Sequence, residues 1–154
     1  MLEPVNVKPP GASAPGKRRI HWHVFFTHFP IAFFGGSAGF QILHLFMAPA
    51  CFELATNVAL VAGVISLLPT IWSGWREWKS RYQGAKGLIF RRKISLAVGL
   101  VTVALPLVTW RLLGFGFFEE AHTNPLHVFY FAGNMLLIAG AALEGYYGGR
   151  LTHR

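Results

Sequence analysis

The 154-residue chain contains no aspartate, only six glutamates and a single cysteine, Cys51. One cysteine rules out an intrachain disulfide and a metal site built from a cluster of cysteines. So few carboxylates argue against hydrolytic sites that use two carboxylates and against carboxylate-bridged pairs of metal ions. The composition is instead strongly apolar, with 53% hydrophobic residues and a mean hydropathy of +0.44.

Four apolar stretches are each long enough to cross a bilayer. They cover residues 20–47, 52–75, 94–113 and 126–147. About 20 apolar residues span roughly 30 Å of hydrocarbon, and backbone amides in lipid must be bonded within their own segment, so each stretch is predicted to be a helix. We therefore expect an all-α, antiparallel bundle of four transmembrane helices over residues 20–154. Residues 1–19, rich in proline and glycine, are predicted to form an extended cytoplasmic segment.

The positive charge is confined almost entirely to one side of this predicted bundle. Of fourteen lysines and arginines, Arg111 alone is placed near the opposite side. The others are Lys8, Lys17, Arg18, Arg19, Arg76, Lys79, Arg81, Lys86, Arg91, Arg92, Lys93, Arg150 and Arg154. Because cytoplasmic loops carry an excess of lysine and arginine, the pattern predicts a multi-pass protein of the bacterial inner membrane with both termini in the cytoplasm. We expect these side chains to contact anionic lipid headgroups, and we do not expect nucleic acid as a partner.

Two histidines are predicted to lie at one depth in the outer half of the bundle. At 1.5 Å per residue, His44 and His127 each fall about 15 Å from the middle of their stretch, both towards the outside. Two neutral imidazoles from different helices at one depth are what axial ligation of a b-type haem requires. Arg111 is near the same level, where a haem propionate is a natural partner for a buried cation. The alternatives are a non-haem metal, or two unrelated histidines bonded to water or carbonyl groups.

A second polar group is predicted towards the cytoplasmic side. His28 falls about 8 Å to that side of the middle of its stretch, and Glu144 of the fourth stretch is at a similar depth. A glutamate facing a histidine inside a membrane indicates a proton path or a quinone pocket, because quinone carbonyls take up protons on reduction. The alternative is an ordinary hydrogen-bonded pair between helices.

The segment HVFFTHFPIA, residues 23–32, places a histidine four residues before His-Phe-Pro-Ile-Ala. It resembles the first-helix signature of a family of bacterial four-helix predicted membrane proteins, and GYYGGRLTH at residues 145–153 is similar to the family's close. Members occur fused to Rieske or cytochrome c domains, so the resemblance implies redox work at a membrane. It also implies a metal or haem site on the cytoplasmic side, for which this chain retains His23, His28 and His153.

The chain departs from that family pattern in two places. Val24 stands where the family usually has proline, and Lys93 stands where the third helix usually opens with a histidine. Losing one histidine weakens the implied cytoplasmic site. His44 and His127 are not part of the family's motif, so the haem prediction for them depends on this chain alone.

The leading hypothesis is a membrane b-type cytochrome subunit of a larger redox complex, with one or two haem b groups. It would carry electrons between the quinone pool and a partner redox protein, and would not be a stand-alone enzyme. The second hypothesis is a non-catalytic membrane anchor or scaffold subunit without a cofactor. The third is a small metal-handling or transport protein that uses the cytoplasmic histidines.

Overall fold

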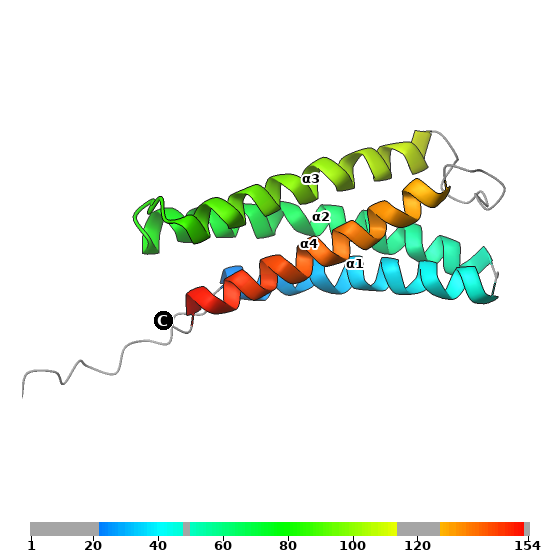
Figure 1. The fold of residues 1–154 in the computed structure, drawn as a ribbon, viewed down its shortest axis with the longest axis horizontal. Helices are drawn as coiled ribbons and strands as arrows, with labels where there is room; N and C mark the ends of the chain where they lie inside the picture. Colours follow the sequence, from blue (N-terminus) through cyan, green and yellow to red (C-terminus); the bar gives the residue numbers. More distant parts are fainter. Residues whose placement is uncertain (1–21, 48–49, 114–126, 153–154) are drawn as a thin grey trace, which may run out of the picture.

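The computed structural model describes residues 22–47, 50–113 and 127–152, and within them the chain is almost entirely helical. The helices are α1 (Trp22–Met47), α2 (Ala50–Arg81), α3 (Leu88–Leu113) and α4 (His127–Thr152) (Figure 1). All four are long enough and apolar enough to cross a membrane, the pattern of a multi-pass membrane protein. The all-α class and the four membrane-length helices predicted from the sequence are therefore confirmed. The N-terminal segment 1–19 and His153 lie outside the described residues.

The connection between α2 and α3 is shorter than the sequence predicts. The apolar stretches end at Trp75 and resume at Ile94, but α2 continues to Arg81 and α3 already begins at Leu88. The charged residues between them are good helix formers, so the helices continue past the apolar boundary. At 1.5 Å per residue the 32 residues of α2 measure about 48 Å, well beyond the roughly 30 Å of hydrocarbon.

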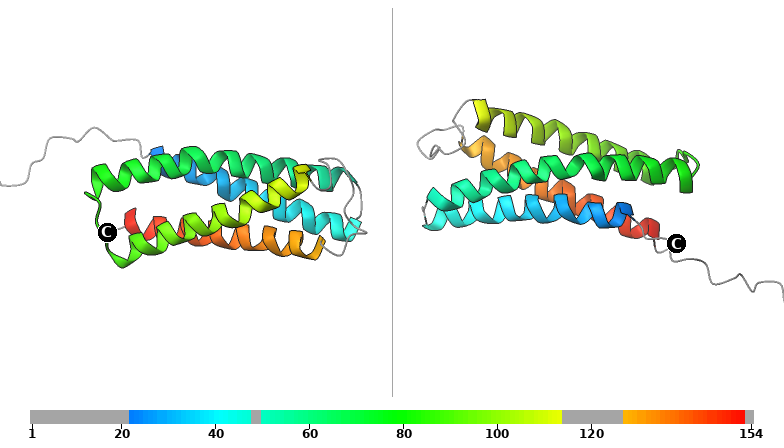
Figure 2. Two further views of the ribbon diagram at one scale, coloured as in Figure 1. Left: turned by 90° about the horizontal axis from the view of Figure 1, so that it is seen from above. Right: turned by 180° about the vertical axis from the view of Figure 1, so that it is seen from behind.

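The four helices form a ring. Helix α1 packs along α2 and α4, and α3 packs against α4 and α2, which leaves α1 and α3 at diagonal corners (Figure 2). Ion pairs identify which helix termini lie together. Arg111 in the last turn of α3 pairs with Glu53 near the start of α2, and Lys93 near the start of α3 pairs with Glu144 on α4. We call these two ends of the bundle the Arg111 end and the Lys93 end.

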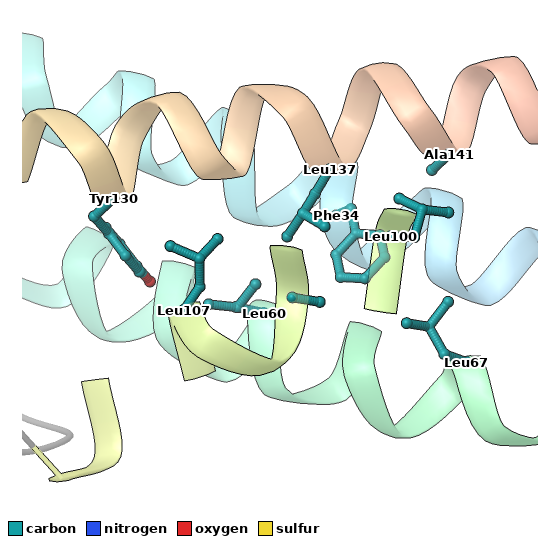
Figure 3. Close-up of a cluster of buried hydrophobic side chains, with 9 residues drawn as sticks. Phe34, Leu60, Leu67, Leu100, Leu107, Tyr130, Leu137 and Ala141 are labelled. Carbon is teal, nitrogen blue, oxygen red and sulfur yellow. The ribbon is translucent and has the colours of Figure 1, made fainter. Parts of the chain in front are cut away.

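Side chains from all four helices form the apolar core in the middle of the bundle (Figure 3). Its most buried members are Phe34 of α1, Leu60 of α2, Ala104 of α3 and Leu137 of α4, each at most 1% exposed. Glycines let the helices approach this closely, as small residues commonly do between membrane helices. A Cβ atom added to Gly63 would lie 2.5 Å from Cε1 of Phe34.

Gly63→Ala is therefore expected to destabilise the bundle by about 1–3 kcal/mol, because the Phe34 ring is completely buried and cannot move aside. Thermal unfolding of the purified protein in detergent measures the effect. Gly39→Ala is the matched control, since an added Cβ meets nothing within 4 Å there and alanine is the better helix former. Equal stability of the two variants would contradict the close approach at Gly63.

Candidate functional site

A cluster of buried polar side chains occupies the Arg111 end of the bundle. Arg111 is 3% exposed, and its Nη2 atom donates to Oε1 of Glu53, which is 5% exposed. Ionisable groups within membrane helices are costly unless paired, and they commonly mark functional sites. The pair joins α2 to α3 and leaves this part of the interior without net charge.

Asn57, one turn from Glu53 on α2, connects this ion pair to α4. Its Oδ1 atom accepts hydrogen bonds from Nε of Arg111 at 3.1 Å and from the hydroxyl of Tyr130 at 2.7 Å. The Arg111 guanidinium also lies over the Tyr130 ring, 5.2 Å from its centroid. Tyr130 is 2% exposed and its hydroxyl would be costly to bury without such a partner. Three helices are therefore tied together around one amide oxygen.

A third set of contacts fixes how α1 sits against α2 and α4. The hydroxyl of Ser37, which is completely buried, lies 2.8 Å from Oδ1 of Asn134 on α4 and 3.1 Å from the backbone oxygen of Thr56 on α2. Asn134 in turn donates from Nδ2 to the backbone oxygen of Tyr130. The short side chain of Ser37 allows this contact only if the helices meet at this height. It therefore sets the register between α1 and α4.

This register brings the two predicted haem ligands to the same height. His44 follows Ser37 by seven residues on α1, and His127 precedes Asn134 by seven residues on α4. Seven residues are about 10 Å along a helix and bring the side chain back to within about 20° of the same face. Each histidine therefore shares the face of its helix that carries the Ser37–Asn134 contact, about 10 Å nearer the Arg111 end.

The surroundings of the two imidazoles differ. His44 is 3% exposed, whereas His127 is partly exposed in the first turn of α4. The His127 ring lies 6.2 Å from the Tyr130 ring, measured between centroids, which links it to the Asn57 and Arg111 contacts. Helices α1 and α4 contact each other in the middle of their length, where the Ser37–Asn134 contact lies.

Gln41 completes the cluster between Ser37 and His44 on α1. Its side chain is 1% exposed, and within the described residues neither its Nε2 nor its Oε1 atom has a hydrogen-bond partner. Four residues separate it from Ser37 and three from His44, so all three share one face of the helix. Gln41 lies one turn nearer the Arg111 end than the Ser37–Asn134 contact, at the height of Tyr130.

The apolar core closes the cluster on its inner side. Phe34 on α1 and Leu137 on α4 each lie one turn nearer the Lys93 end than the Ser37–Asn134 contact, and both are completely buried (Figure 3). The polar cluster and the polar groups at the Lys93 end are therefore separated by a layer of side chains that offers no hydrogen bonds.

The residues predicted at the Lys93 end have other partners than the sequence suggests. Glu144 forms an ion pair with Nζ of Lys93 at 3.0 Å, and its side chain is 18% exposed. His28 is exposed, and its Nδ1 atom lies 2.6 Å from the backbone oxygen of Val24 in the same helix. The Glu144–Lys93 pair joins α3 to α4, as Glu53–Arg111 joins α2 to α3 at the other end.

His23 and His28, the described members of the predicted cytoplasmic metal site, have separate hydrogen-bond partners. Nδ1 of His23 lies 3.2 Å from the hydroxyl of Ser73, and the ring packs over Gly74, where an added Cβ would lie 2.7 Å from Cε1. Among the residues that the structure describes, no three histidine, cysteine or acidic side chains are grouped so that they could hold a metal ion. His153, the third member of the predicted set, lies outside those residues.

Glu53 is the functional candidate that sequence reasoning missed. The sequence identifies Arg111 as a buried cation that needs a partner, but the partner in the structure is this carboxylate. The signal was present in the chain: Glu53 and Asn57 lie one turn apart near the start of an apolar stretch, at the level predicted for Arg111.

An open groove of about 530 Å³ lies elsewhere, on the surface of α1 and α2. It is lined almost entirely by apolar and small side chains, among them Ala32, Gly36, Ala55 and Ala59, with Cys51 also at its wall. Gly36 is one residue, or about 100° of helical rotation, away from Ser37. The groove therefore belongs to a different face of α1 from the polar cluster.

No protein-family model, curated protein or solved structure matches this chain.

Glu53→Gln is expected to destabilise the bundle by about 3–5 kcal/mol, because it leaves the buried Arg111 guanidinium without its counter-charge. Unfolding in detergent measures the loss. The matched control is Glu77→Gln, which breaks the exposed Glu77–Arg81 pair and is expected to cost less than about 1 kcal/mol. Combining Glu53→Met with Arg111→Met is expected to recover most of the stability, since neither charge then remains buried. A double variant as unstable as Glu53→Gln would contradict this explanation.

Proposed function

We propose that this protein is a membrane b-type cytochrome subunit of a larger redox complex, with a haem b held between His44 and His127. The observation that carries the proposal is the register set by Ser37 and Asn134. It brings two histidines from neighbouring helices to one height, on the faces through which those helices meet. In this proposal the chain carries electrons between the quinone pool and a partner redox protein.

The residue types at this end of the bundle suit such a group, and α1 and α4 would have to move apart to admit it, because His44 and Gln41 are buried against the protein. Imidazole nitrogens are common axial ligands of haem iron. Aromatic walls are available from Tyr130 and from Trp110, whose rings meet edge to face at 6.3 Å. The amide of Gln41 offers a buried hydrogen-bonding group that the described residues leave unused.

The chain's own residues define the environment of the site. A haem b would supply a one-electron carrier whose potential depends on its axial ligands and on nearby charges. The Glu53–Arg111 pair keeps the neighbouring interior electrically balanced. The layer formed by Phe34, Leu60 and Leu137 excludes water from the side facing the middle of the bundle. Each of these features favours a stable and buried redox group.

The proposed topology is antiparallel, with both termini and the Lys93 end in the cytoplasm of a bacterial cell and the Arg111 end facing outwards. Its support is the distribution of exposed cations among the described residues. All seven are at the Lys93 end: Arg76, Lys79, Arg81, Lys86, Arg91, Arg92 and Arg150. Several of them lie over aromatic rings, such as Lys79 at 4.1 Å from the Trp75 ring centroid. Aromatic and basic residues together are typical of the cytoplasmic membrane interface.

Exchange of protons and electrons with quinone is proposed for the Lys93 end. Glu144 and Lys93 form a partly buried ion pair there, and His28 is exposed one helix away on α1. A paired glutamate and lysine within membrane-length helices can accept or release a proton when a bound group changes its charge. This part of the proposal keeps Glu144 and His28 as separate groups, not as a directly bonded pair.

The second candidate function is a membrane anchor or scaffold subunit without a cofactor. The observation in its favour is that Glu53 and Asn57 already satisfy the charge of Arg111, so this cation does not require a haem propionate. In that case the polar cluster only specifies how the four helices pack. In the proposed cytochrome His44 and His127 bind the cofactor, whereas in the anchor subunit they contribute only to assembly.

The purified protein is expected to show a reducible Soret band and α-band in a reduced-minus-oxidised spectrum. His44→Ala and His127→Ala are each expected to abolish the low-spin spectrum, because each removes one axial ligand. His28→Ala is the matched control, since this histidine is exposed and its Nδ1 atom contacts the backbone oxygen of Val24 in its own helix, so the variant should leave the spectrum intact.

The cofactor proposal fails if the wild-type protein, prepared from membranes with haem available, has no such bands. It also fails if both histidine variants keep the wild-type spectrum. If His44→Ala and His127→Ala assemble normally and leave electron transfer through the complex unchanged, the anchor function is the correct one.

Cys51 provides a test of the topology without any engineered residue. It is the only cysteine in the chain, it is exposed, and it lies in the first turn of α2 at the Arg111 end. A membrane-impermeant maleimide is expected to label it in intact spheroplasts. Cys51→Ser is the control for specificity. Labelling only in inside-out vesicles would reverse the proposed orientation.

A further inference from the structure

The first two turns of α1, residues 22–29, have little buried surface. We call them the first segment. None of these eight residues is buried, and Trp22, Phe25 and Phe29 are each at least 40% exposed. The buried side chains of α1 begin at Pro30. In lipid, apolar side chains gain little from contact with another helix. Polar contacts therefore decide how firmly the first segment is held.

Pro30 interrupts the backbone hydrogen bonds of α1 directly after this segment. Proline has no backbone N–H, so the carbonyl group of Phe26, four residues earlier, loses its usual donor within the helix. In membrane helices a serine or threonine of a neighbouring helix commonly replaces such a donor. Here the hydroxyl of Thr70 on α2 donates to the Phe26 oxygen at 3.0 Å. Helices bend most readily at proline, so α1 has a hinge at Pro30 and a bond to α2 just before it.

A second contact joins the first segment to α2, since Nδ1 of His23 lies 3.2 Å from Oγ of Ser73. Both hydroxyls also have an acceptor within their own helix. Oγ1 of Thr70 lies 2.8 Å from the backbone oxygen of Ser66, and Oγ of Ser73 lies 3.0 Å from that of Thr70. If the first segment moves away, both hydroxyls can still donate within α2. The polar cost of this movement then falls mainly on the Phe26 carbonyl.

The other side of the hinge is packed against α4. Ile31, the residue after the hinge, lies against Gly145, where an added Cβ would be 3.2 Å from Cδ1 of Ile31. Gly145 follows Glu144, so the hinge is at the height of the Glu144–Lys93 pair. Lys93 is also close enough to His23 to act on the charge of its ring. An outward turn of the first segment would therefore uncover this side of the ion pair.

We propose that the first segment is a gate that turns about Pro30, is latched to α2 by Thr70 and, when open, gives lipid-dissolved quinone access to the Glu144–Lys93 pair. The hinge and the latch do not depend on the proposed cytochrome function. The choice of quinone as the molecule admitted does depend on it, because quinone is proposed to exchange protons at the Lys93 end.

Pulsed electron spin resonance between two nitroxide labels measures the position of the gate in lipid nanodiscs. The labels are attached to cysteines that replace Val24 on the gate and Ser80 near the end of α2, both exposed, in a Cys51→Ser background. Labels at residues 45 and 80 form the matched control pair, since Leu45 is exposed and lies on α1 beyond the hinge. A turn about Pro30 changes the first distance and leaves the second unchanged.

Thr70→Val removes the hydroxyl and keeps the shape of the side chain. It is expected to raise the ratio of open to closed gate by about tenfold, because the Phe26 carbonyl loses its donor in the closed state. Thr70→Ser keeps the hydroxyl and is expected to behave as the wild type. Pro30→Ala supplies an N–H from α1 itself to the Phe26 carbonyl. In this background Thr70→Val is expected to change the ratio by less than about twofold.

Dicyclohexylcarbodiimide, a lipid-soluble reagent that modifies carboxyl groups, tests what the open gate exposes. Thr70→Val is expected to speed modification of Glu144 by at least about twofold, and Pro30→Ala to slow it, because the open state exposes the carboxyl group. Mass spectrometry measures the rate, and Glu144→Gln is the control for the site of reaction. Neither measurement needs haem or quinone, so failure of the gate and failure of the cytochrome function can be told apart.

Three results would overturn the proposal. If Thr70→Val leaves the distances between the labels at residues 24 and 80 unchanged, Thr70 is not a latch. If Thr70→Val has the same effect in the wild-type and Pro30→Ala backgrounds, it does not act through the Phe26 carbonyl. If the gate opens and the rate of Glu144 modification stays the same, the gate does not lead to the ion pair.

Discussion

A guanidinium group enclosed by four apolar helices must find its counter-charge inside the protein, and Arg111 does so through Glu53. This requirement governs the Arg111 end of the bundle. Helices α2 and α3 have to place the two charges within contact, and Asn57 and Tyr130 complete the donors and acceptors around them. Membrane helices gain little from apolar association, since lipid is as apolar as their side chains. Polar contacts of this kind therefore decide which packing the helices adopt.

The contacts of Ser37 fix the position of α1 in the same way. Because its hydroxyl meets both α2 and α4, the height of α1 is fixed against two neighbours at once. Everything on the same face of α1, including Gln41 and His44, then has a defined level against α4. A slip of one turn would move His44 away from His127 by about 5 Å and would also break the Ser37 contacts. The packing of α1 and the proposed site therefore depend on the same Ser37 contacts.

Much of the fold could be predicted from the sequence, but the polar cluster only in part. Long apolar stretches force helices in lipid, which is why four helices could be predicted and why α1 agrees closely with its stretch. The ends of α2 and α3 were missed because charged residues can continue a helix into water, where hydropathy gives no signal. Glu53 was missed because its carboxylate lies at the edge of an apolar stretch, where glutamates usually contact water. Which partner Arg111 takes depends on the rotation of two helices, and that rotation is set by packing of all four.

The length of α2 has a consequence for how the protein responds to its membrane. Its last turns extend about two turns beyond Trp75, and the arginines and lysines there are on flexible stems. When the bilayer is thicker, these flexible side chains can extend outwards to the lipid phosphates. When it is thinner, they can bend back towards them, so the bundle does not have to tilt. The Arg111 end has no exposed lysine or arginine in the described helices with which to adjust. A change in bilayer thickness should therefore be accommodated at the Lys93 end. The buried polar cluster should then stay at a constant depth from the membrane surface at the Arg111 end.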